Sequence, residues 1–272
     1  MRSRWRSASL LTLTLLAFAG CASHPPAATS PDDLWQRYAR AVEDAKYPAP
    51  AHISRRLVAL TNGTAGLTWN EQGQILMATW TKQKYYEGTV GQPYVNSFGP
   101  IWVSAIPFIQ RFCRSLQLEG DALRLRIAQR LGLPPDSQND AFVQMWIDPK
   151  IFFRPCADPE VTDGECELNL TTVPPAHDGS CPWEGSYAGQ TSQAFTTVSQ
   201  GHLDWMCSNW KSTYTGDPRT SYPWTALGYT YDWNDPRDIY GESEFVVPKA
   251  STVTIQSVTP TDEYCAPAAP RK

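Results

Sequence analysis

The chain has 272 residues, of which 42% are hydrophobic, and its formal net charge is −4. That length can bury a core, and the composition excludes a coiled coil, a collagen-like chain and a largely disordered one. The negative charge argues against a nucleic-acid partner, because nucleic-acid binding relies on basic residues that neutralise phosphates. Since the single long apolar run lies at the start of the chain, the sequence also excludes a polytopic membrane protein.

The first residues have the pattern of an export signal. Arginines within the first six positions precede an apolar run over 10–18 that is too short to span a bilayer. The run ends at Phe18-Ala19-Gly20-Cys21, which resembles the lipobox of bacterial lipoprotein signal peptides, with Phe18 where leucine is usual. The alternative is an ordinary secretory signal that a cysteine follows by chance.

The resemblance implies that residues 1–20 are a signal peptide and that Cys21 carries acyl chains such as palmitate. These chains would anchor the protein in a lipid bilayer, which is then its first partner. Ala22 stands where an aspartate would signal inner-membrane retention, so we expect the outer membrane, on its periplasmic or surface side. Residues 21–33 comprise the lipidated cysteine and a flexible tether of small residues and prolines.

Six further cysteines indicate a disulfide-tied body in an oxidising compartment. They are Cys113, Cys156, Cys166, Cys181, Cys207 and Cys265. Their connectivity stays open, except that Cys156 and Cys166 are the best local pair because turn-forming residues separate them. The remaining bridges are expected to tie the C-terminal half together. A zinc site is the alternative, but the chain has no CxxC or HxxxH spacing.

Residues 34–272 are predicted to form one disulfide-tied α+β domain, a mixed antiparallel sheet with a few helices. A sub-boundary near 135–150 is the alternative to a single body. The predicted helices are 34–46, capped by Asp32 or Asp33, then 105–116, 121–131 with Asp121 as N-cap, and 199–211. The predicted strands are a hairpin over 69–80, then 142–147, 151–153, 226–233, 244–247 and 252–258.

An acidic pair, Glu242 and Glu244, stands at the entrance of the strand over 244–247, and a turn and a second strand follow. The segment resembles the Glu-x-Glu segment of arginine-directed mono-ADP-ribosyltransferases. The resemblance implies that NAD is a substrate, that Glu244 stabilises an oxocarbenium-like state and that Glu242 contacts the acceptor guanidinium. Two positions apart on a strand, both side chains point to one face. The alternative is a pair of solvated acids at a strand edge.

Two further elements of that family have counterparts in the expected order. Arg154 follows three apolar residues and matches the arginine that holds a cofactor phosphate, a bidentate contact that suits a guanidinium. Thr197, within 195–199, stands for the family's Ser-Thr-Ser-like strand, from which this sequence departs at its last two positions. The alternative for Arg154 is an ion pair with Asp158 or Glu160.

The segment over 222–233 is the most aromatic of the chain. Tyr229, Tyr231 and Trp233 alternate along a predicted strand, so their rings share one face. We expect these rings, and Tyr229 in particular, either to stack on a nicotinamide, a sugar or a peptide, or to belong to the core. His202 is predicted to be a packed or capping residue of its helix, because the chain has no Gly-x-Ser-x-Gly motif for a hydrolase triad.

The sequence therefore predicts an exported, lipid-anchored α+β protein of the cell envelope, with two hypotheses for its role. The first is an NAD-dependent mono-ADP-ribosyltransferase-like enzyme that uses Glu244 and Glu242, supported by Arg154, Thr197 and Tyr229. The second is a non-catalytic lipoprotein that binds a protein or glycan through an aromatic face. No metal is predicted in either case.

Overall fold

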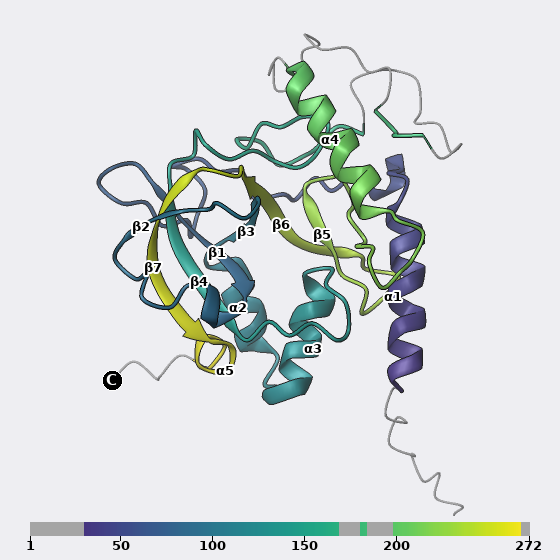
Figure 1. Ribbon diagram of the computed structural model, residues 1–272, viewed down its shortest axis with the longest axis horizontal. Helices are drawn as coiled ribbons and strands as arrows, with labels where there is room; N and C mark the ends of the chain where they lie inside the picture. The colour runs from purple at the N-terminus through teal and green to yellow at the C-terminus, as the bar shows by residue number, and fades with distance from the viewer. Residues whose placement is uncertain (1–29, 169–179, 184–197, 268–272) are drawn as a thin grey trace, which may run out of the picture.

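The computed structural model describes residues 30–168, 180–183 and 198–267 (Figure 1). The predicted signal peptide, Cys21 and Thr197 lie outside these ranges. The helices are α1 (Pro31–Ala45), α2 (Phe108–Ser115), α3 (Gly120–Arg130), α4 (Gln200–Thr213) and α5 (Thr261–Tyr264), with short 3-10 turns at Pro50–His52 and Gln83–Tyr85. The strands are β1 (Ile75–Thr81), β2 (Pro93–Val95), β3 (Ile101–Ala105), β4 (Ala141–Ile147), β5 (Tyr229–Tyr231), β6 (Tyr240–Val247) and β7 (Thr252–Pro260).

The seven strands form one antiparallel sheet with the order β2-β7-β4-β1-β3-β6-β5. The predicted α+β class and the disulfide-tied antiparallel sheet are therefore confirmed. The strand β4 occupies the place of the sub-boundary considered near 135–150, and it pairs with β1 on one side and β7 on the other. A domain boundary there would cut the middle of the sheet.

Two strands that follow one another in sequence are separated in the sheet. β6 and β7 are joined by a short turn, but β4, β1 and β3 lie between them, as Figure 1 shows. β6 instead pairs with β3 and β5, so Glu244 lies opposite Ser104 of β3. The predicted hairpin over 69–80 forms close to its turn, where Trp69 pairs with Ile75 of β1 in an antiparallel bridge and the N–H of Leu76 donates to the carbonyl of Thr68 at 2.9 Å; the rest of β1 pairs with β3 and β4.

Helix boundaries differ from the prediction where capping decides them. α1 begins at Pro31, within the predicted tether, because Ser30 and Asp33 form a reciprocal capping box, so neither aspartate is the N-cap. α3 begins at Gly120 rather than after Asp121. Its first N–H donates to the carboxylate of Asp262 in α5 at 2.9 Å, a cap supplied by a residue distant in sequence.

Both faces of the sheet are buried. Alternate residues of β1 serve two cores: Ile75 and Met77 pack into one, and Ala78 and Trp80 into the other, beneath α2 and α3. A third cluster joins α1 to the β5 region, and a fourth joins α4 to the segment around Trp224. The sheet thus supports helices on both sides, and α4 covers the end where β5 and β6 lie (Figure 1).

Three disulfides join the six cysteines of the described chain. Cys156 pairs with Cys166, as predicted, over a separation of 10 residues, and Cys181 pairs with Cys207. Cys113 of α2 pairs with Cys265, which follows α5, over a separation of 152 residues. This third bridge ties the end of the chain to its middle rather than to its C-terminal half.

Removal of the long-range disulfide is expected to cost more stability than removal of the local one. Chain-entropy arguments give about 5 kcal/mol for a loop of the size that Cys113–Cys265 closes and about 3 kcal/mol for that of Cys156–Cys166. Urea unfolding of the Cys113→Ser/Cys265→Ser and Cys156→Ser/Cys166→Ser double variants measures both losses. Equal losses, or the opposite order, would contradict the argument.

Candidate functional site

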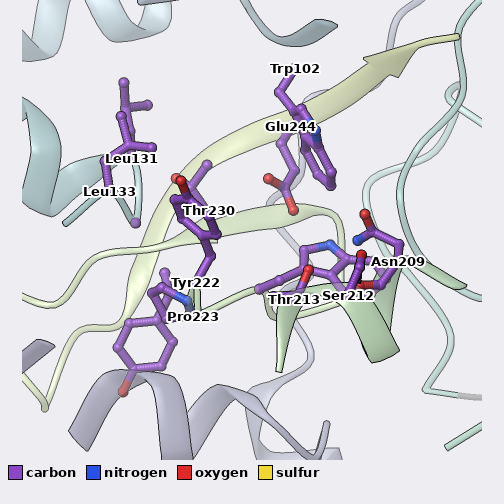
Figure 2. A pocket seen from close by; sticks show the side chains of 13 residues that line it. Trp102, Leu131, Leu133, Asn209, Ser212, Thr213, Tyr222, Pro223, Thr230 and Glu244 are labelled. Atoms are coloured by element: carbon purple, nitrogen blue, oxygen red, sulfur yellow. Dashed lines mark hydrogen bonds between the residues drawn. The ribbon is translucent and has the colours of Figure 1, made fainter. Parts of the chain in front are cut away.

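A cavity of about 450 Å³ lies where β3, β5 and β6 meet the end of α4 and the turn after α3. Its size is in the range of small-molecule sites. Figure 2 shows Glu244 reaching into it from β6, with Asn209, Ser212 and Thr213 from α4 on one side. The lining residues are Trp102, Leu131, Gly132, Leu133, Asn209, Ser212, Thr213, Tyr222, Pro223, Trp224, Thr230, Tyr231 and Glu244.

Glu244 is held by its backbone, and one of its carboxyl oxygens is buried without a partner among the described residues. Its N–H donates to the carbonyl of Gly228 at 3.0 Å, and the side chain is only 6% exposed. Within the described part of the chain, its Oε1 atom has no hydrogen-bond partner. A buried carboxyl oxygen in that state loses the hydrogen bonds of water without compensation, so a ligand that supplies a donor would restore them.

The environment also changes the acidity of Glu244. Burial raises its pKa to about 8, because removal from water disfavours the charged carboxylate. The group is therefore mostly a neutral acid near pH 7, and it can donate, accept or transfer a proton near neutrality. A carboxyl group with this property in a cavity is a candidate functional group.

Trp224 lines the same cavity and carries a second buried polar atom. Among the described residues its indole N–H has no acceptor. Its backbone is fixed by the hydroxyl of Tyr214, which donates to the Trp224 carbonyl at 2.6 Å. Its ring lies 6.3 Å from that of Trp102 and 6.0 Å from that of Trp205, both nearly perpendicular to it. The cavity thus combines an aromatic wall with two unsatisfied polar groups.

Glu242 has a different environment from Glu244. Its carboxylate accepts a hydrogen bond from Arg130 Nε at 2.8 Å, and it does not line the cavity. Arg130 also lies 3.6 Å from Asp232, which Arg126 contacts with both of its terminal nitrogens. Glu242 therefore belongs to a network of ion pairs that joins α3 to β6, and it is not free to contact an acceptor guanidinium.

Arg154 is not brought to Glu244. Its side chain is fully buried, and it donates to the backbone carbonyls of Glu160, Val58, Val161 and Asp163. Its guanidinium lies 5.1 Å from the ring of Phe245, which points to the opposite face of β6 from Glu244. This position corrects the expectation that Arg154 holds a cofactor phosphate: the residue organises a loop of the interior.

Of the other predicted site residues, the aromatic ones belong to the core, and Thr197 lies outside the described residues. Tyr229 is 1% exposed, and its hydroxyl donates to the carbonyl of His52 at 2.7 Å. Tyr231 and Trp233 are also buried and pack against α1, so this row of rings belongs to the core. Only Tyr231 of the three lines the cavity.

His202 and a cluster of three acidic residues are further candidate groups, and they do not line the cavity. The imidazole Nε2 of His202 lies 2.7 Å from the carbonyl oxygen of Cys156, and burial lowers its pKa, as suits a packed residue. Asp158, Glu160 and Asp163 have carboxylate oxygens within 4.8 Å of one another. Glu160 already accepts hydrogen bonds from the N–H groups of Thr162 and Asp163. This cluster caps the turns around Arg154, and no feature of it calls for a metal.

Sequence reasoning missed most of the cavity wall. It singled out the aromatic segment over 222–233 but selected three rings of which only Tyr231 lines the cavity, and it passed over Tyr222, Pro223 and Trp224, which line it too. Trp102 and the polar residues Asn209, Ser212 and Thr213 carried no motif. The last three do stand near the end of a predicted helix, with polar side chains in place of the usual apolar stripe.

Comparisons with protein-family models, with curated proteins and with solved structures gave no match. Among the described residues, no helix has the length and apolar character needed to cross a membrane.

The two glutamates of β6 are expected to affect the free energy of unfolding differently: Glu244 through its dependence on pH, and Glu242 through its ion pair with Arg130. Because the pKa of Glu244 is raised in the fold, the folded state holds a proton that the unfolded state has lost between pH 4.5 and about 8. The free energy of unfolding of the wild type should therefore fall by about 1.4 kcal/mol per pH unit in that window. Glu244→Gln should remove most of this slope, as urea unfolding at several pH values would measure.

Glu242→Gln is the matched control on the same strand. It leaves Arg130 without its charged partner, so it should lower the free energy of unfolding by about 1–3 kcal/mol and keep the wild-type pH slope. A pH slope that survives Glu244→Gln, or disappears in Glu242→Gln, would show that Glu244 is not the titrating group.

Proposed function

We propose that this protein is an exported lipoprotein of the cell envelope, anchored by acyl chains on Cys21, whose folded body binds a small organic ligand in the Glu244 cavity. The single observation that carries the binding function is the Glu244 carboxyl group. It is 6% exposed, lines a cavity of about 450 Å³ and has an oxygen with no partner among the described residues.

Export is supported by the disulfides. Three bridges join cysteines that lie 10, 26 and 152 residues apart, and stable disulfides form in oxidising compartments such as the periplasm or cell surface. The lipobox-like end of the leader then supports an anchor on Cys21. The helix α1 begins at Pro31, so the linker between the anchor and the body is short.

Binding is supported by what the cavity wall offers. A buried carboxyl group without a hydrogen-bond partner lowers the stability of the fold, because it has lost its contacts with water. A well-packed apolar residue at the same position would avoid that cost, so the glutamate is better explained by a role in binding. The aromatic residues Trp102, Tyr222 and Trp224 provide apolar area for a ligand, and Asn209 and Thr213 provide polar groups. This composition is typical of sites for small molecules.

A second candidate is the ADP-ribosyl transfer that the Glu-x-Glu segment suggests. The observation in its favour is that Glu244 lines a cavity. Against it, Glu242 pairs with Arg130, and Arg154 donates to backbone carbonyls of the interior. Incubation of the soluble 22–272 fragment with NAD separates the candidates. Nicotinamide release by the wild type and not by Glu244→Gln would establish transfer, and we expect no release because none of the described lining residues is a cation for the diphosphate.

Ligand binding is tested with three phenyl compounds of nearly equal size: 2-amino-1-phenylethanol, 1-phenyl-1,2-ethanediol and mandelate. At least one should bind the wild-type body with a dissociation constant of about 1 mM or below, measured by titration calorimetry. Ser212→Trp places an indole in the cavity and should abolish that binding. Ser208→Trp, on the same helix but not in the cavity wall, is the control and should retain it.

The outcomes are decisive for the proposal. Binding that Ser212→Trp abolishes and Ser208→Trp spares supports a ligand site at Glu244. If none of the three compounds binds the folded wild type, or if both variants behave alike, the cavity is not the binding site.

The anchor is tested in cells that export the full chain. Cys21→Ser should move the protein from the membrane fraction to the soluble fraction and remove incorporation of labelled palmitate, because an acyl chain would no longer be attached. Ala22→Ser is the control and should leave both unchanged. A Cys21→Ser protein that stays in the membrane fraction would contradict lipid anchoring at this residue.

A further inference from the structure

The charges around the cavity are unbalanced. Of the 13 described residues in its wall, Glu244 is the one acid, and none is lysine, arginine or histidine. The nearby Arg130 is engaged by Glu242 and by Asp232. Lys211 lies on α4 outside the cavity wall and has an interaction of its own. No described cation is therefore placed to neutralise the carboxylate of Glu244.

Two helices end at the cavity. Asn209, Ser212 and Thr213 belong to the last turns of α4, and Leu131 and Leu133 directly follow α3. The C-terminal end of a helix carries a partial negative charge from its carbonyl groups, and it favours cations. Figure 2 shows these residues on two sides of the space into which Glu244 points. The two helix ends and the Glu244 carboxylate therefore both favour a positively charged ligand.

The aromatic wall adds a third contribution with the same preference. Glu244 of β6 pairs directly with Ser104 of β3. Trp102 stands two residues before Ser104 on β3, so it lies diagonally across from Glu244. Trp224 and Tyr222 complete the wall. The faces of such rings attract organic cations and also cover apolar groups. Among the described residues the indole N–H of Trp224 has no acceptor, and a ligand oxygen that reached it would supply one.

We infer that the Glu244 cavity selects a small organic cation: a protonated amine on an apolar body that also carries a hydrogen-bond acceptor. This inference rests on the proposed function and specifies its ligand class. The amine pairs with the Glu244 carboxylate, the apolar body lies against the aromatic wall, and a hydroxyl or carbonyl oxygen accepts from Trp224.

Binding of such a cation must displace a proton. The empty cavity holds Glu244 largely as the neutral acid at neutral pH because of its raised pKa, and the ion pair needs the carboxylate. The proton leaves to solvent as the amine binds, so binding strengthens as pH rises towards about 8.

Other titratable and charged groups lie around Glu244. They are Tyr214, Tyr222, Tyr229 and Tyr231, together with the charged Arg130 and Lys211. Burial raises the pKa of Tyr214, Tyr229 and Tyr231 above the ordinary value of 10, so these three remain neutral throughout the window. The pKa of Glu244, by contrast, is about 8 and lies within the window.

The three phenyl compounds also test the charge of the ligand, because they differ mainly in one group. 2-Amino-1-phenylethanol should bind at least tenfold more tightly than 1-phenyl-1,2-ethanediol at pH 8, and mandelate should bind most weakly. The affinity for the amine should rise about tenfold per pH unit from pH 6 towards 8, with close to one proton released at the low end. Calorimetry in buffers of different ionisation enthalpy measures that proton.

Glu244→Gln keeps the shape of the side chain and removes its charge. It should weaken binding of the amine at least tenfold, abolish proton release and leave the diol unchanged. Glu263→Gln, at an exposed position of α5, is the control and should match the wild type. Circular dichroism before each titration establishes that the variants are folded.

The failure of this inference is distinct from failure of the proposed function. If the diol or mandelate binds as tightly as the amine, or if the amine binds without proton release, the cavity is a ligand site but not a cation site. If no compound binds the folded wild type, the proposed function fails together with the inference.

Discussion

The pairing of β6 between β3 and β5 determines where the chemistry of this protein can lie. Phe245 and Val247 pack into the main core of the sheet, so the alternation of the strand turns Glu244 to the other face. A shift of one residue in this register would place the carboxyl group in an apolar core and Phe245 in the cavity. The cavity, the raised pKa of Glu244 and the ligand preference that we propose all depend on this one register.

The same register sets a conflict between stability and function. Glu244 is buried without a hydrogen-bond partner among the described residues, and this costs stability as pH rises and the group ionises. The surrounding fold offsets that cost with three disulfides, cores on both faces of the sheet and the ion pairs that join α3 to β5 and β6. A destabilising polar group that persists in a well-packed frame is a common property of functional sites.

The predicted elements and the predicted site differ in how well local sequence determines them. The helices α2 and α4 and the strand β4 follow from apolar periodicity, and the Cys156–Cys166 bridge follows from a local turn. Arg154 could not be judged in this way, because its four carbonyl acceptors come from two separate loops. The cap of α3 by Asp262 is of the same kind, since the two residues are distant in sequence.

The sequence by itself determined the α+β class, the cysteine count and the presence of an acidic pair before an apolar strand, because these depend on composition, periodicity and short spacing. The export leader is a prediction from the same kind of short pattern. Only the tertiary structure decided that β6 and β7 lie apart, that Glu242 is neutralised by Arg130 and that Glu244 faces an aromatic cavity. The physical reason is that desolvation and pairing of a charge are set by neighbours that the fold brings from elsewhere in the chain.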